Sequence, residues 1–171
     1  MRYNYALLVF LLISHSLMAQ LITHGPVTGG VTPTTARMYV RTTQAAEVRI
    51  ELDTDAGFGS PLSFTDSTKA LRDSSNIINL SGLTANTLYH YRLYVNGVLD
   101  TLRGSFKTYP PVGQRGHYKW GVLSCQEYGT YNTFNALYNR APQLVLHTGD
   151  WTYPDYQLPG DHRTDWAIHQ L

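Results

Sequence analysis

The sequence predicts a two-part fold: an all-β sandwich, followed by the first βαβ unit of an α/β domain. Within residues 20–108, apolar and polar residues alternate in short segments, which is the period of strands with one buried face. From residue 118 the pattern changes to two apolar runs separated by a segment of helical period, the order of a βαβ unit. Residues 109–117 are rich in proline and glycine and are expected to form a linker between the two parts.

The first nineteen residues have the pattern of a secretory signal peptide. Arg2 is followed by an apolar run from Ala6 to Ile13 and by small residues before Gln20. The apolar run is much shorter than the roughly 20 residues of a membrane-spanning helix. We therefore expect residues 1–19 to be removed and the protein to be periplasmic or extracellular. An uncleaved membrane anchor is the alternative interpretation.

Charge and cysteine content narrow the classes of partner. The chain of 171 residues has 13 Lys and Arg against 12 Asp and Glu. This balance gives no electrostatic signature for binding nucleic acid or anionic lipid. Cys125 is the only cysteine, so no disulfide can form within the chain. Its thiol is expected to be buried, paired with another chain, or used as a metal ligand.

The alternation is clearest between residues 46 and 52. Val48, Ile50 and Leu52 are expected to face the core, with the charged residues between them, including Glu51, facing outward. A similar pattern occurs at residues 36–41, and Asn96-Gly97 is a tight-turn signal. Further strands are expected at residues 76–80, 89–95 and 104–108. Several short strands at this spacing favour a sandwich.

One local motif refines the type of sandwich. Leu83 precedes Tyr89 by six residues, with a turn-like stretch between them. This resembles the tyrosine corner of fibronectin type III and related sandwiches, in which the tyrosine hydroxyl bonds to backbone upstream. The resemblance implies a fibronectin III-like N-terminal domain.

The second part begins with an expected strand at residues 118–123. A helix is expected from Thr130 or Asn132 to Pro142, with an apolar face formed by Tyr131, Phe134, Leu137 and Tyr138. The following apolar run, residues 143–147, is typical of a strand buried on both faces. The two strands of such a unit are parallel and joined by a right-handed crossover, so Cys125 and Asp150 are expected at the same edge, where α/β sheets bind ligands.

Three residues near this edge could hold metal ions: Cys125, Asp150 and Tyr153. A carboxylate can bridge two ions, a phenolate favours a hard and highly charged ion, and a thiolate adds a soft ligand. No catalytic residue other than these metal ligands is predicted.

The segments Ser124-Cys125-Gln126 and Leu146-His147-x-Gly149-Asp150-x-x-Tyr153 resemble those of the alkaline phosphatase D family, which belongs to the metallophosphoesterases. Members also share the order of export signal, small β-sandwich and phosphatase domain. The resemblance implies that Cys125 is a terminal ligand of a ferric ion and that Tyr153 binds this ion as phenolate. Asp150 would bridge it to a second divalent metal, often calcium. The implied substrates are phosphate mono- or diesters.

Purple acid phosphatases share the Gly149-Asp150-x-x-Tyr153 spacing, but have aspartate where this chain has Cys125, which favours the alkaline phosphatase D family. The later Gly-Asn-His motif of the superfamily does not occur in this sequence. We therefore expect the N-terminal portion of an exported phosphoric ester hydrolase, without appreciable turnover as this chain. The alternative is a non-catalytic extracellular β-sandwich binding module with a degenerate phosphatase remnant.

Overall fold

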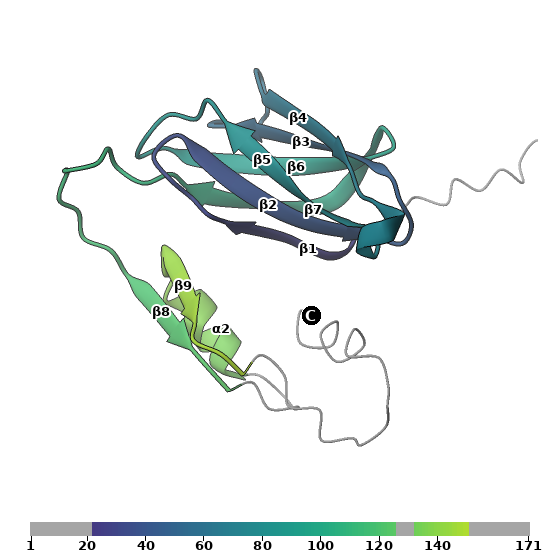
Figure 1. Ribbon diagram of the computed structural model, residues 1–171. Coiled ribbons are helices and arrows are strands. Elements are labelled where there is room, and N and C mark those ends of the chain that lie inside the picture. The colour runs from purple at the N-terminus through teal and green to yellow at the C-terminus, as the bar shows by residue number, and fades with distance from the viewer. Residues whose placement is uncertain (1–21, 126–131, 151–171) are drawn as a thin grey trace, which may run out of the picture.

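The computed structural model describes residues 22–125 and 132–150, and the expected signal peptide lies outside these ranges. Two antiparallel sheets pack face to face in the N-terminal part (Figure 1). One sheet has the order β1-β2-β5 and the other β4-β3-β6-β7. The strands are β1 (Ile22–Gly29), β2 (Thr35–Thr42), β3 (Glu47–Asp53), β4 (Leu62–Ser67), β5 (Ser75–Ser81), β6 (Leu88–Val95) and β7 (Val98–Lys107). A short 3-10 helix, η1 (Ala70–Arg72), precedes β5. The predicted sandwich is confirmed.

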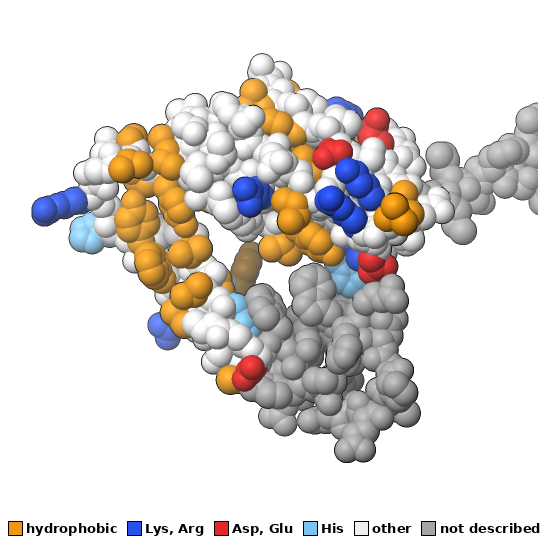
Figure 2. Space-filling model, viewed as in Figure 1, with side chains coloured by type: hydrophobic (Ala, Val, Ile, Leu, Met, Phe, Trp, Pro, Cys, Tyr) orange, Lys and Arg blue, Asp and Glu red, His pale blue; other side chains and the backbone are white. Residues whose placement is uncertain are grey.

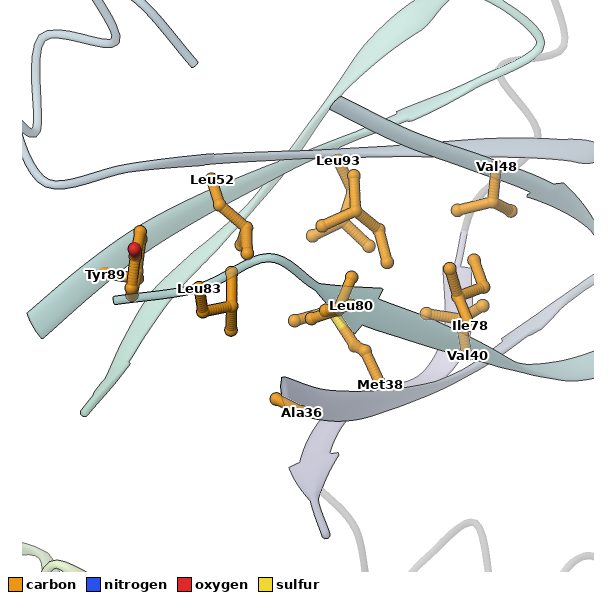
Figure 3. Close-up of a cluster of buried hydrophobic side chains, with 11 residues drawn as sticks. Ala36, Met38, Val40, Val48, Leu52, Ile78, Leu80, Leu83, Tyr89 and Leu93 are labelled. Carbon is orange, nitrogen blue, oxygen red and sulfur yellow. The ribbon is translucent and has the colours of Figure 1, made fainter. Parts of the chain in front are cut away.

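The core lies between the two sheets (Figure 3). Val48, Ile50 and Leu52 on β3 are fully buried, as their alternation predicted. Met38 and Val40 on β2, in the other sheet, are also fully buried and belong to the same core. Each such side chain contributes roughly 1.5–3 kcal/mol when it is removed from water. Alternation along the strands therefore places the apolar side chains that contribute most to folding stability between the two sheets.

The tyrosine corner is present at the start of β6. The hydroxyl of Tyr89 accepts a hydrogen bond from the backbone N–H of Thr84, at 2.9 Å. The ring of Tyr89 stacks on Phe106 of β7, with centroids 6.0 Å apart. Leu83 is buried beside it (Figure 3). These contacts of Tyr89 fix the loop between β5 and β6, which connects the two sheets, to the core.

The sequence patterns did not predict strands β1 and β4, and both lie at sheet edges. Strand β1 contains Gly25 and Pro26, and its register with β2 shifts on both sides of His24. Proline and irregular register are tolerated at an edge, where one side of the backbone makes no ladder. Strand β4 is mainly polar, and Phe64 is its one side chain packed against the core.

Glu51 is buried, which corrects the expectation that it faces water. It is on the outer face of β3, yet its residue is only 6% exposed. Arg49 forms an ion pair with it, and Arg92 Nε lies 2.7 Å from its Oε2. Arg49 also covers the ring of Tyr94, at 3.7 Å from the centroid, and Arg92 that of Phe58, at 4.4 Å. Arginine stems and aromatic rings thus shield a carboxylate that the alternation places outside.

The C-terminal part has the predicted βαβ order, with β8 (Trp120–Leu123), α2 (Asn132–Asn139) and β9 (Leu144–His147). Strands β8 and β9 are parallel, and Trp120 to Leu123 pair with Leu144 to His147 in order. The helix packs so closely on β8 that a Cβ atom added at Gly121 would lie only 2.6 Å from Leu137 Cδ1. Glycine at this position lets helix and sheet approach. Thr130 and Tyr131, expected at the helix start, lie outside the described residues.

Burial in this part is lower than the sequence predicts. Val145 and Leu146 on β9, expected to be buried on both faces, are 46% and 48% exposed. Tyr138, expected on the packed face of α2, is 83% exposed. Apolar side chains are accordingly visible at the surface in Figure 2. The reason is geometric, since a two-stranded sheet with one short helix cannot cover both of its faces. Across residues 22–125 and 132–150, none of the helices is both long and apolar enough to traverse a bilayer.

Candidate metal centre

Backbone hydrogen bonds join the loops that follow β8 and β9. The N–H of Thr148 donates to the carbonyl of Leu123 at 2.9 Å, and the N–H of Cys125 donates to that of Gly149 at 3.2 Å. These bonds extend the contact between the parallel strands beyond their last paired residues. Cys125 and Asp150 therefore leave the sheet side by side, at its carboxyl edge.

The side chains of these two residues meet. Cys125 Sγ lies 3.7 Å from Asp150 Oδ2, with the thiol as donor. Both residues are exposed, so solvent and dissolved ions can reach the pair. The prediction that parallel strands bring Cys125 and Asp150 to the same edge agrees with this geometry.

Both residues have unusual backbone conformations. Cys125 has φ of 59° and Asp150 has φ of 55°, in the left-handed region, and Gly149 between β9 and Asp150 has φ of 125°. Such a conformation costs a non-glycine residue on the order of 1–3 kcal/mol and is found disproportionately at functional sites. The Gly149 N–H donates to His147 Nδ1 at 3.3 Å, which helps to fix the turn. The paired loops thus hold both residues in a left-handed backbone conformation that non-glycine residues adopt only rarely.

The spacing fits a shared cation. A transition-metal ion lies about 2.3 Å from a thiolate and about 2.1 Å from a carboxylate oxygen. Two such donors are then about 3.1–3.8 Å apart for angles of roughly 90–120° at the ion. The observed 3.7 Å falls within this interval. Metal binding would replace the thiol proton that now connects the two groups.

The third predicted ligand, Tyr153, lies outside the described residues. Among the residues that are described, no three His, Cys, Asp or Glu side chains gather in a way that could hold a metal ion. The structure therefore places two of the three predicted donors together. The positive φ angles of Cys125 and Asp150 had no signal in the sequence, apart from the glycine that precedes Asp150.

Comparison with solved structures finds a similar fold over most of this chain. The structure described as "Structure of PhoD" superposes with a TM-score of 0.72 and 24% identity, over 80% of this chain. The chain spans only 29% of the length of that protein. At this identity the likeness shows a shared fold, a sandwich followed by the start of an α/β domain.

Two further solved structures match slightly more than half of this chain. The sensor domain of the anti-sigma factor RsgI4 from Pseudobacteroides cellulosolvens is 18% identical over 56% of this chain and 99% of its own, with a TM-score of 0.42. A fibronectin type III domain from the human KIAA0970 protein is 12% identical over 54% of this chain and 76% of its own, with a TM-score of 0.39.

Sequence comparison gives the family of the N-terminal part. No curated protein matches the chain. Residues 18–111, more than half of the chain, match the family described as "Domain of unknown function (DUF7800)". The matched residues include every strand of the sandwich. The chain belongs to this family, DUF7800.

Proposed function

We propose that this chain is the N-terminal portion of an exported, dinuclear-metal phosphoric ester hydrolase of the alkaline phosphatase D type. One observation carries the proposal. Cys125 Sγ and Asp150 Oδ2, a thiol and a carboxylate of the kinds that bind metal ions, lie 3.7 Å apart at neighbouring strand ends, in a chain that shares its fold with PhoD over 80% of its length. The domains we propose are a signal peptide at 1–19, the sandwich at 20–108, a linker at 109–117 and part of the phosphoesterase domain at 118–171.

Each of the three ligands has a distinct role in this proposal. Cys125 would hold a ferric ion as thiolate, and Tyr153 would hold the same ion as phenolate. Asp150 would bridge the ferric ion to a second divalent metal, for which calcium is the candidate. When bound, a metal pair of this kind orients a phosphate ester and activates water for its hydrolysis. This chain contributes the ligands and the positive-φ turns that hold two of them.

Binding of ferric iron is the test of the site. We expect a tyrosinate-to-iron absorption band in the visible range when ferric ion is added to the purified chain. Tyr153→Phe should abolish the band, because no other phenol is part of the proposed site. Cys125→Ser and Asp150→Asn should each weaken iron binding at least about tenfold, since each removes a charged ligand.

Tyr138→Phe is the matched control. Tyr138 is exposed on α2, so its loss should leave the band unchanged. A folded chain that stays colourless and iron-free would refute the proposed site and favour the non-catalytic binding module. A band that survives Tyr153→Phe would refute the role of Tyr153.

Export can be tested separately from metal binding. In a host with a secretory pathway, mass spectrometry of the mature protein should find Gln20 at its N-terminus. An intact residue 1 on exported protein would indicate an uncleaved anchor instead.

A further inference from the structure

A second site lies away from the candidate metal centre, where the end of the sandwich, the linker and the start of β9 come together. A cavity of about 260 Å³ opens there. Lys107 and Tyr109 at the end of the sandwich, Arg115, His117 and Tyr118 of the linker region, and Gln143 before β9 all line it. Segments from three parts of the chain thus form its wall.

Hydrogen bonds hold this wall in place. Tyr109 donates its N–H to Thr32 at 3.3 Å and accepts the N–H of Asn86 at 2.9 Å, which fixes the first linker residue to the sandwich. The ring of Tyr118 meets that of Tyr109 edge to face, with centroids 6.2 Å apart.

The opposite wall is fixed in the same way. The N–H of Gln143 donates to the carbonyl of Lys119 at 2.9 Å, and the side-chain oxygen of Gln143 accepts the N–H of Lys119. The cavity is therefore built by defined contacts on both sides.

The charge of the lining has one sign. Lys107 and Arg115 carry positive charge, and among the described residues no Asp or Glu lines the cavity. Within residues 22–125 and 132–150, the cations that form ion pairs are those of Arg41, Arg49 and Arg92. Neither Lys107 nor Arg115 is therefore paired with a carboxylate of these residues. Two uncompensated cations beside one cavity create a positive potential that attracts an anion.

We propose that this cavity binds a compact tetrahedral oxyanion, either as free phosphate or as the head of a phosphate monoester. The guanidinium of Arg115 can hold two oxygens of such a group in a bidentate manner, and Lys107 adds a second cation. The amide of Gln143 supplies a neutral donor. The volume, below the range of about 300–1,000 Å³ common for drug-sized ligands, suits a small anion.

Calorimetric titration of the full chain with sodium phosphate tests the proposal. The protein is treated with chelator and kept at constant ionic strength, so that neither metal-bound phosphate nor general screening contributes. We expect saturable binding of one phosphate per chain. The double variant Lys107→Gln with Arg115→Gln should bind at least about tenfold more weakly, because both charge-assisted contacts are lost.

The matched control is Lys69→Gln with Arg103→Gln, which removes the same charge from exposed residues outside the cavity. It should bind phosphate as the parent does. Equal loss in the two double variants, or no saturable heat with the parent, would overturn the proposal.

Glycerol phosphate distinguishes the two sources of the anion. If it binds more tightly than phosphate, the site takes a monoester; if it does not bind, the site takes the free ion. Cys125→Ser should not change either titration, so this site and the proposed metal centre can fail independently.

Discussion

Tyr89→Phe should lower the free energy of unfolding of the sandwich by about 1 kcal/mol. The change removes one hydroxyl and leaves the buried ring in contact with Phe106. The hydroxyl accepts the Thr84 N–H at 2.9 Å, and a neutral hydrogen bond of this kind contributes about 0.5–1.5 kcal/mol. Thr84 is itself exposed, so water can partly replace the lost acceptor and keep the cost near the middle of this interval.

Thermal or urea unfolding followed by far-ultraviolet circular dichroism measures this cost. Tryptophan fluorescence would not report it, because all three tryptophans, at positions 120, 151 and 166, follow the sandwich. For a domain of this size, 1 kcal/mol corresponds to a fall in Tm of about 4–8 °C.

Tyr94→Phe is the matched control for this measurement. Tyr94 is on the same strand, but its ring lies on the outer face under Arg49. Phenylalanine keeps this cation–π contact, so the change should stay within about 0.5 kcal/mol.

Two results would refute the reasoning on the tyrosine corner. Unchanged stability of Tyr89→Phe would mean that the hydroxyl contributes nothing to the folded state. A loss of about 3–5 kcal/mol, the range for deleting a whole aromatic ring, would mean that the ring itself has moved.

Three further predictions concern other parts of the chain. Gly104→Ala should destabilise the sandwich by about 1–3 kcal/mol, because the ring of Tyr91 lies where the new Cβ would be placed. The loss of stability, measured by urea unfolding, should be smaller when Tyr91→Ala is also present. An equal loss with and without Tyr91→Ala would contradict the predicted clash. The amides of Asp55 and Ser60 donate to the Asp53 carboxylate and hold the pKa of that carboxyl below its ordinary value of 3.8. The resulting stabilisation is present above pH 3.8 and is lost as the pH falls through the lower pKa of the folded state. Between pH 6 and pH 3, the Tm of the parent should therefore fall by more than the Tm of Asp53→Asn. An equal fall in Tm for the two proteins would show that the Asp53 carboxylate makes no such contribution. Limited proteolysis should cleave residues 118–171 before the sandwich, because apolar side chains of β8 and β9 are exposed; equal resistance of both parts, read by mass spectrometry, would contradict this.

The sequence predicted the interior strands of the sandwich best. On β3, alternation identified Val48, Ile50 and Leu52 as core residues, and all three are fully buried. Edge strands β1 and β4 were missed, because an edge tolerates proline and polar residues that weaken the pattern. Alternation also cannot show which outward residues become covered, as Arg49 and Arg92 cover Glu51.

For the candidate metal centre, sequence reasoning predicted the sheet edge at which Cys125 and Asp150 meet. A helical crossover makes the two strands of a βαβ unit parallel, which was sufficient to place Cys125 and Asp150 at the same edge. The role of Tyr153 remains a prediction. The cavity beside the linker was not foreseen, since its lining residues are separated by up to 57 positions, from Asn86 to Gln143.

The sequence by itself determined the fold class and the pairing of β8 with β9, because both depend on short-range periodicity and on the handedness of the chain. Tertiary structure alone decided the 3.7 Å between Cys125 Sγ and Asp150 Oδ2 and the left-handed backbone at both residues. It also decided the burial of Glu51 and the gathering of cations around the cavity. These features depend on contacts between residues far apart in the chain, and no local pattern specifies such contacts.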